Sequence, residues 1–342
     1  MNVKELETTA RALVAPGKGI LAADESHGTI EKRFQSIQIA NTEDNRRAYR
    51  DMLFTAKGFG DHVSGVILFD ETIQQKGLNG TPFPEVLKKS GSIAGIKVDA
   101  GTVAMTGSPE EKITQGLDGL RERLAQYRQL GARFAKWRAV ITIGSTIPTL
   151  PNLRENANLL ARYAALCQEA DIVPIVEPEV LMDGDNTIQR CLQVTEQTLH
   201  ETFNALYDHC VVLEGMLLKP NMIVAGKQCP AQATPELVAE LTVQCFRRTV
   251  PAAVPGIVFL SGGQSAAQAT HHLSLMNAAG PHPWQISFSY GRALQDEALK
   301  AWGGKPENVA KGQKLFAARA RLNSLARSGK YDPKMEAELV PA

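Results

Sequence analysis

The sequence predicts one α/β domain, residues 1–342, folded as a (β/α)8 barrel of the TIM type. Short apolar runs alternate with longer segments of helical periodicity, and eight such runs occur within about 270 residues, the usual size of this barrel. They lie at residues 19–24, 64–70, 94–99, 134–141, 172–179, 215–220, 257–261 and 284–290. A doubly wound sheet is the second option, but no G-x-G-x-x-G turn follows the first run.

The segments between the runs carry the signs of amphipathic helices, most clearly at 152–170, 187–210 and 234–250. The last of these begins with Thr234 at an N-cap position and Pro235 at the first helical position. The N-terminal segment also opens like an amphipathic helix. Residues 303–342 combine a helix with a polar tail, and we expect the tail, about 330–342, to be flexible.

Composition and net charge argue against several classes of protein, namely nucleic-acid-binding, membrane and secreted proteins. The chain is 44% hydrophobic and 21% charged with a formal net charge of +1, so it carries no footprint for nucleic acid or an anionic membrane. No apolar run approaches the ~20 residues that span a bilayer, and no signal peptide is recognisable. Five cysteines without a C-x-x-C pair suggest free thiols in a reducing compartment. We therefore expect a cytoplasmic protein.

Polar residues gather where the predicted strands end. Successive runs end in or carry Asp24, Glu25 and Ser26; Lys97 and Asp99; Lys136 and Arg138; Glu177 and Glu179; Lys219; Ser261, Gly262 and Gly263; and Ser289, Tyr290, Gly291 and Arg292. Residues two apart on a strand share a face, and barrel active sites lie at the carboxyl ends of the strands. Any one of these residues is explained by an ion pair or a cap. Together they predict a polyanion site equipped with acid–base groups.

The turns after runs seven and eight suggest where a phosphate would bind. Gly262 and Gly263 allow backbone N–H groups to approach an anion closely, and a following helix N-terminus adds a favourable dipole. Arg292 adds a guanidinium that binds phosphate through two hydrogen bonds. The glycines alone would also fit a plain tight turn.

Lys219 stands between an apolar run and Pro220, where a buried charge is costly. With an ordinary pKa of about 10.4, only about 0.04% of a lysine is neutral at pH 7, so a nucleophile needs burial or a cationic neighbour such as Lys136. A neutral amine there would form an imine with a carbonyl substrate. The alternative is a lysine paired with a carboxylate such as Glu177.

Ten strings along the chain resemble the class I fructose-bisphosphate aldolase family, in order and at family spacing from about residue 5 to about 333. They are GILAADES (19–26), GIKVDAG (95–101), TQGLDGL (114–120), AKWRAV (135–140), ANLLARYA (157–164), IVPIVEPE (172–179), EGMLLKPNM (214–222), RRTVPAAV (247–254), FLSGGQS (259–265) and SYGRALQ (289–295). No single string is specific, but ten in register are.

The resemblance implies a role for each catalytic candidate. Lys219 matches the Schiff-base lysine, and Lys136 the lysine beside the imine. Glu177 matches the acid/base of carbinolamine dehydration, with Glu179 close by. Asp24 matches the aspartate that orients and activates the C4 hydroxyl of the sugar.

The resemblance also implies two phosphate sites. Lys97 matches a residue of the distal phosphate site, with Ser26 as a partner, and Arg138 matches a phosphate ligand. The site for the other phosphate is implied at Ser261, Gly262, Gly291 and Arg292, with Lys32 and Arg33 as a basic pair near that end of the cleft.

The implied activity is reversible cleavage of fructose 1,6-bisphosphate to dihydroxyacetone phosphate and glyceraldehyde 3-phosphate, in glycolysis and gluconeogenesis. The protonated imine withdraws the electrons, so neither a metal nor a cofactor is expected. The expected partners are these sugar and triose phosphates, and family resemblance suggests a homotetramer.

Two departures from the family pattern stand out. The family often ends in a tyrosine that enters the site, whereas this sequence ends in Val-Pro-Ala and its last tyrosine is Tyr331. The loop after the first run carries His27 and Thr29, where smaller residues or serine are common. We expect the first departure to affect enamine protonation and the second to affect the preference between fructose 1,6-bisphosphate and fructose 1-phosphate.

Three other functions compete with this interpretation. A metal-dependent aldolase would need histidines at strand ends, but the seven here fall mostly in helices or loops. Another imine-forming barrel lyase would share Lys219. A non-catalytic sugar-phosphate-binding or scaffold protein would need no activated amine, so Lys219, Glu177 and Asp24 argue against it.

Overall fold

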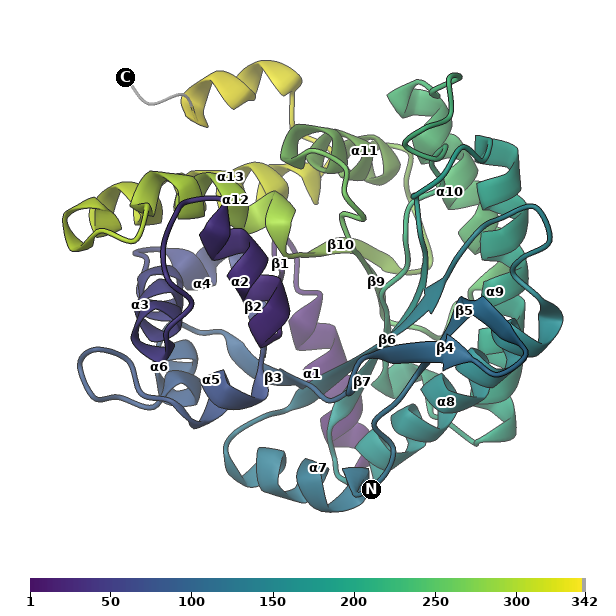
Figure 1. The fold of residues 1–342 in the computed structure, drawn as a ribbon, viewed down its shortest axis with the longest axis horizontal. Helices are drawn as coiled ribbons and strands as arrows, with labels where there is room; N and C mark the ends of the chain where they lie inside the picture. The colour runs from purple at the N-terminus through teal and green to yellow at the C-terminus, as the bar shows by residue number, and fades with distance from the viewer. Residues whose placement is uncertain (340–342) are drawn as a thin grey trace.

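The computed structural model describes residues 1–339 and shows a closed barrel of eight parallel strands surrounded by helices (Figure 1). Around the barrel the strands follow the order β1-β10-β9-β8-β7-β6-β3-β2, and β1 pairs with both β10 and β2 to close it. Their bounds are β1 Gly19–Ala23, β2 Val63–Leu68, β3 Ile93–Lys97, β6 Phe134–Ile141, β7 Val173–Val180, β8 Leu217–Leu218, β9 Gly256–Phe259 and β10 Gln285–Tyr290. The predicted barrel is confirmed, and each predicted run contains or overlaps one strand.

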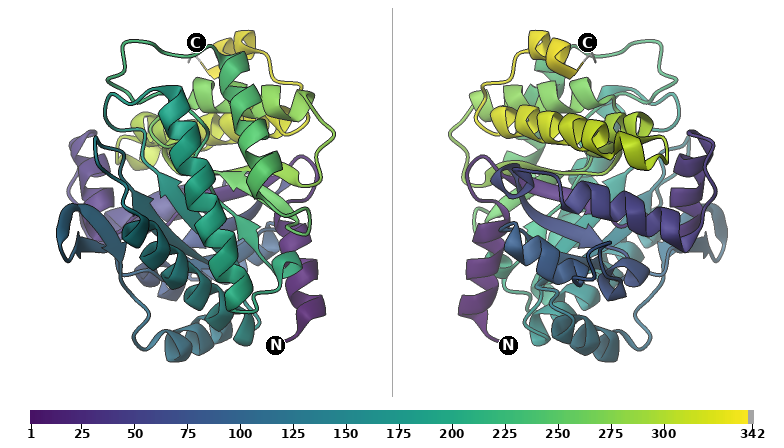
Figure 2. Two further views of the ribbon diagram at one scale, coloured as in Figure 1. Left: turned by 90° about the vertical axis from the view of Figure 1, so that its right-hand side faces the viewer. Right: turned by 90° about the vertical axis from the view of Figure 1, so that its left-hand side faces the viewer.

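Helices ring the strands on all sides (Figures 1 and 2). They are α1 Val3–Leu13, α2 His27–Gln35, α3 Glu43–Phe54, α4 Phe59–His62, α5 Asp70–Gln74, α6 Phe83–Lys89, α7 Leu120–Gln129, α8 Leu150–Glu169, α9 Ile188–Asp208, α10 Pro235–Thr249, α11 Ala266–Ala278, α12 Arg292–Trp302 and α13 Val309–Ala326. The expected caps are present, since the Thr234 side chain accepts a hydrogen bond from the amide of Leu237 at the start of α10. Within residues 1–339, no helix is long and apolar enough to cross a membrane.

The amino end of the barrel is filled with apolar side chains and closed by α1. Leu6 and Leu13 of α1 pack with Ile20 of β1, Phe134 of β6 and Val258 of β9 in one buried cluster. The Phe134 ring packs against Gly95 of the neighbouring strand β3. A Cβ at position 95 would lie only 2.3 Å from the ring, so a larger residue would not fit there. Burying each large side chain here contributes about 1.5–3 kcal/mol to stability.

A hairpin that the sequence analysis did not predict interrupts the alternation of strands and helices between β3 and β6. It is formed by β4 Thr102–Met105 and β5 Ser108–Thr114. Glu111 of β5, which is buried, accepts hydrogen bonds from the amide and the hydroxyl of Thr149, each 2.7 Å, at the N-cap of α8. The hairpin is therefore fastened to the helix that follows β6.

The C-terminal segment packs against the helices outside the barrel. The fully buried Arg319 of α13 forms bidentate ion pairs with Glu297 of α12 and with Glu336, which lies in the short 3-10 helix Pro333–Leu339. The Tyr331 hydroxyl also donates to Glu336 at 2.7 Å. The tail expected to be flexible, about 330–342, thus includes a packed segment, while its residues 340–342 lie outside the described part of the chain.

Candidate active site

Lys219 lies one residue beyond β8, at the carboxyl end of the barrel. Its amide donates to the carbonyl of Val176 on β7 at 2.8 Å, but Pro220 has no N–H to continue the ladder. The Asn221 side chain takes over, accepting a hydrogen bond from the amide of Val180 at 3.0 Å. The strand end that carries Lys219 is therefore fixed to β7, although only two residues of β8 are regular strand.

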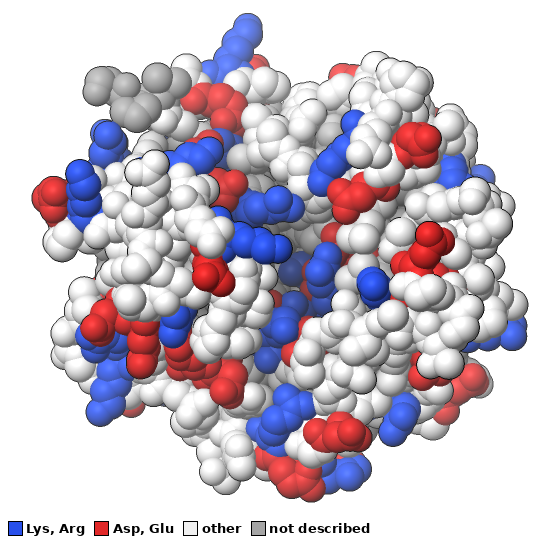
Figure 3. Space-filling model, viewed as in Figure 1, with Lys and Arg blue, Asp and Glu red and all other residues white. Residues whose placement is uncertain are grey.

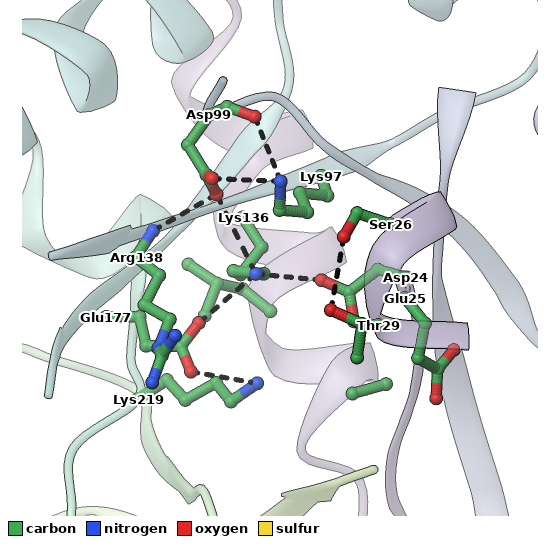
Figure 4. A network of polar contacts seen from close by, with 12 residues as sticks. Asp24, Glu25, Ser26, Thr29, Lys97, Asp99, Lys136, Arg138, Glu177 and Lys219 are labelled. Atoms are coloured by element: carbon green, nitrogen blue, oxygen red, sulfur yellow. Dashed lines mark hydrogen bonds and ion pairs between the residues drawn. The ribbon is translucent and has the colours of Figure 1, made fainter. Parts of the chain in front are cut away.

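Glu177 of β7 connects the two buried lysines of the site. Its Oε1 lies 3.2 Å from Nζ of Lys219, and its Oε2 lies 3.5 Å from Nζ of Lys136. The side chains of all three residues are only 5% exposed (Figure 4). One carboxylate thus contacts both amines, and a proton transferred between Lys219 and Glu177 would stay within hydrogen-bond reach.

Lys136 of β6 lies at the centre of the network in Figure 4. Its Nζ is 2.8 Å from Asp24, at the end of β1, and 3.8 Å from Asp99, beyond β3. Burial opposes the charged form of Lys136, but Asp24, Glu177 and Asp99 outweigh it and raise its pKa. Burial likewise opposes ionisation of Asp24, yet Lys136 and Lys219 hold its pKa well below the usual range. At neutral pH, Asp24 is a carboxylate and Lys136 an ammonium.

The contacts of Lys136 bear on the prediction that its positive charge keeps Lys219 neutral. Three carboxylates already offset the charge of Lys136, and the nearest charged group to Lys219 is Glu177. The structure therefore brings together both arrangements considered for Lys219, the neighbouring cation and the paired carboxylate. Its neutral form in the free protein stays a prediction.

Asp99 holds the neighbouring basic residues in place. One oxygen is 2.9 Å from Nζ of Lys97 and accepts from the amide of Gly101 at 3.2 Å, while the other accepts from the amide of Arg138 at 3.4 Å. It was noted at a strand end but not included among the predicted site residues. The alternation Lys97, Asp99 along the strand was the signal that would have identified it.

Arg138 and Glu179 form an ion pair at the rim of the barrel. Burial disfavours the guanidinium charge, but Glu179 more than offsets it and raises the pKa of Arg138. The Arg138 side chain is 41% exposed and that of Glu179 only 8%, so the cation is the member that faces an incoming ligand. Lys97, 17% exposed, lies on the other side of Asp99, which contacts both residues (Figure 4).

Another buried carboxylate, Glu25, holds two arginines. It lies 2.5 Å from Arg33 of α2 and pairs with Arg50 of α3. Although burial favours its neutral form, both arginines lower the pKa of Glu25. Ser26, the N-cap of α2, contacts the Thr29 hydroxyl at 3.1 Å. Sequence reasoning missed Arg50, because nothing in a helical segment indicates a partner 25 residues away.

The loops after β9 and β10 have the geometry expected of an anion site. Gly262 and Gly263 adopt positive φ, +59° and +92°, which places successive amides in a turn before the N-terminus of α11. No hydrogen bond among the described residues uses these two amides. Gly291 is the N-cap of α12, and a Cβ there would lie 3.4 Å from Nη2 of Arg33.

The Gln264 side chain connects the loop after β9 to α11. It donates to the carbonyl of Ser261 at 3.1 Å, and its oxygen lies 2.6 Å from Nδ1 of His272 on α11. Burial, with a smaller contribution from the neighbouring His271, lowers the pKa of His272 to about 4, so this imidazole is neutral at pH 7. Neither Gln264 nor His272 was predicted as a site residue.

A cavity of about 410 Å³ opens beside these loops between α2 and α12. Its basic lining residues are Lys32, Arg33, Arg292 and Lys300. Figure 3 shows lysine and arginine side chains gathered around the central hollow of this face. At the carboxyl end of the barrel, four cations, Lys97, Lys136, Arg138 and Lys219, pair with four carboxylates, Asp24, Asp99, Glu177 and Glu179.

Twelve of the fourteen predicted site residues therefore lie at the carboxyl ends of the strands or in the turns that follow them, and the other two, Lys32 and Arg33, lie in the last turn of α2. His27 and Thr29 are the two residues after β1 that depart from the family pattern. His27 contacts Glu71 at 3.2 Å, and the Thr29 hydroxyl contacts that of Ser26. Within the described residues, no group of three or more His, Cys, Asp or Glu side chains is placed to hold a metal ion.

Comparisons with known proteins identify the family of this chain. The family model for class-I fructose-bisphosphate aldolase matches residues 5–340. A probable fructose-bisphosphate aldolase class 1 from Xanthomonas campestris is 55% identical over 97% of this chain and 99% of its own length. A cytoplasmic isozyme of fructose-bisphosphate aldolase from Spinacia oleracea is 56% identical over 96% of this chain and 92% of its own. A crystal structure of fructose-bisphosphate aldolase from Plasmodium falciparum, in complex with TRAP and an inhibitor, superposes with a TM-score of 0.95 at 53% identity, covering 96% of this chain and 95% of that one.

Proposed function

The chain belongs to the class I fructose-bisphosphate aldolase family, and from this premise we propose how its own residues carry out the reaction. The activity is reversible aldol cleavage of fructose 1,6-bisphosphate to dihydroxyacetone phosphate and glyceraldehyde 3-phosphate. The observation that carries the assignment of residues is the buried contact of Lys219 with Glu177, 3.2 Å, beside the Lys136–Asp24 pair.

Imine formation is the first chemical step that we assign. Nζ of Lys219 adds to the C2 ketone, and Glu177 takes up and returns the protons needed to expel water from the carbinolamine. Because the contact between the two side chains is buried, these transfers are shielded from bulk water. Glu179 contributes by fixing Arg138 at the rim.

Bond cleavage follows from the charges around the imine. The C4 hydroxyl gives up its proton to Asp24, the electrons of the C3–C4 bond pass to the iminium, and glyceraldehyde 3-phosphate leaves the resulting enamine. Asp24 is ionised at neutral pH and orients that hydroxyl, while Lys136 offsets the developing oxyanion. Protonation of the enamine and hydrolysis then release dihydroxyacetone phosphate and restore Lys219.

The two phosphate groups bind at opposite sides of the opening. We assign one to Lys97, Arg138 and Ser26, and the other to the loops that carry Ser261, Gly262, Gly291 and Arg292, with Lys32 and Arg33 nearby. The second assignment is supported by the two amides of the β9 loop that donate to no described group.

A cleavage assay tests this function. Purified protein should convert fructose 1,6-bisphosphate to both triose phosphates, detected with coupled dehydrogenases, and should retain full activity after treatment with EDTA. Loss of activity to EDTA would support the metal-dependent alternative. Binding of the sugar phosphate without cleavage would support the non-catalytic one.

Two further proposals concern the setting of the enzyme. We propose a cytoplasmic location, supported by the name of the spinach relative, and fractionation with compartment markers tests it. We also propose a homotetramer on family resemblance. Size-exclusion chromatography with light scattering should then give four times the 37.1 kDa chain mass.

A further inference from the structure

Lys227, on the loop after β8, lies close to the proposed phosphate loop and is not one of the predicted site residues. A Cβ built on Gly263 would lie 2.8 Å from Nζ of Lys227 and 3.5 Å from Nη2 of Arg292. The two cations therefore converge on one backbone position of the loop, that of Gly263.

The backbone around Lys227 is fixed, so this approach is built into the fold. The amide of Lys227 donates to the carbonyl of Met182 at 2.8 Å, and that of Gly226 to the carbonyl of Asn186 at 2.8 Å. A side chain at position 226 would collide with the carbonyl of Gly184, 2.3 Å from its Cβ. These hydrogen bonds hold the loop after β8 against the loop after β7. They fix the backbone of Lys227 in a position from which its side chain reaches Gly263.

The charges at this position are incompletely balanced. Lys227 pairs with Asp183 at 2.9 Å, but the side chains are 44% and 65% exposed, so water weakens the attraction. Within residues 1–339, no hydrogen bond or ion pair engages the Arg292 guanidinium. Asp296 of α12 attracts Arg292, but it shares that attraction with Arg33 and Lys300. Lys227, Arg292 and the unused amides would therefore together favour a dianion over the single charge of Asp183.

We infer that Lys227 is an additional ligand of the phosphate group bound by the β9 loop and Arg292, and that it raises affinity for phosphorylated ketoses. This inference rests on the proposed function. Because β9 pairs with β8, the phosphate concerned is the one closest to Lys219, which dihydroxyacetone phosphate retains. On binding, Lys227 exchanges Asp183 for the phosphate.

Borohydride trapping of Lys219 as a function of ligand concentration tests the inference. Lys227→Met should raise the half-saturating concentration of dihydroxyacetone phosphate about 5- to 10-fold. Dihydroxyacetone, which lacks the phosphate, should show no change. Lys227→Arg should stay within about 2-fold of the wild type, since it keeps the charge.

Arg154→Met is the matched control, because it removes one positive charge and one exposed ion pair, with Glu201 at 3.3 Å, on the outside of the barrel. It should leave both half-saturating concentrations unchanged. Equal values for Lys227→Met and the wild type, or an equal loss for both ligands, would overturn the inference alone. A wild-type protein that is not trapped at all would overturn the proposed function, and the inference with it.

Discussion

Strand β6 carries two residues that share a face but lie in opposite environments. Phe134, near the amino end, is buried among apolar side chains from α1 and the neighbouring strands. Lys136, two residues further, is equally inaccessible but surrounded by Asp24, Asp99 and Glu177. The same division runs along β7, from Val173 and Ile175 to Glu177 and Glu179.

The amino end of the barrel stabilises the fold, whereas the carboxyl end carries the catalytic groups. The amino end gains free energy by removing apolar surface from water, a large and geometry-tolerant effect. The carboxyl end brings eight charges together and buries most of them, which costs free energy unless each is paired, and its pairs add little net stability. We therefore expect changes at the amino end to alter unfolding and changes at the carboxyl end to alter catalysis.

The largest expected effect is that of Lys219→Met. Without the amine no imine forms, so kcat for cleavage of fructose 1,6-bisphosphate should fall by about 10⁴-fold or more. The free energy of unfolding should stay within about 1 kcal/mol, because Glu177 keeps Lys136 as a partner. Steady-state kinetics and urea denaturation measure the two quantities. A loss of several kcal/mol would show that Lys219 is structural.

Phe134→Ala should have the opposite profile. Removing a fully buried ring leaves a cavity and should lower the free energy of unfolding by about 3–5 kcal/mol. Since Lys136 keeps its three carboxylates, kcat per folded molecule should change by less than about 3-fold. Phe134→Leu, which costs less, serves if the alanine variant does not fold. A fall in kcat as large as the one for Lys219→Met would contradict the division between the two ends.

The smallest predicted effect concerns pH. The pKa of His272 is lowered from 6.5 to about 4, mainly by burial, so between these values the unfolded chain binds more protons than the folded one. Stability should therefore fall as pH drops below about 6.5, by about 2 kcal/mol at pH 5 from this group. His272→Asn should remove that loss, measured by urea denaturation at pH 7 and pH 5.

Two variants isolate this effect. His200→Asn changes an exposed histidine and should leave the difference between the two pH values as in the wild type. The stability loss of Phe134→Ala should be the same at both values, because no charge is involved. An unchanged pH difference in His272→Asn would show that burial of this imidazole is not the source of the loss of stability at low pH.

Much of the barrel was predictable from the sequence, because runs buried on both faces are apolar and the helices between them are amphipathic. The β4–β5 hairpin was not, since residues such as Thr102 and Glu110 are exposed and show no clear alternation. The extent of β8 was also overestimated, because Pro220 ends the ladder and Asn221 continues it through a side chain, which no apolar pattern reveals.

The site was predictable to the extent that its residues lie at strand ends. Lys97, Lys136, Glu177 and Lys219 follow directly from that position. Partners brought together by the barrel's closure were missed, such as Arg50 with Glu25, and so was Lys227, which lies in a loop without periodicity. Their spacing along the chain carries no information about their distance in space.

The most direct test of the central claim is the identity of the amine that forms the imine. The protein is incubated with dihydroxyacetone phosphate, reduced with borohydride and digested, and the modified peptide is mapped by mass spectrometry. We expect a single reduced adduct on Lys219, in the peptide that contains LLKPNM. An adduct on Lys136 or any other lysine, or no adduct, would contradict it.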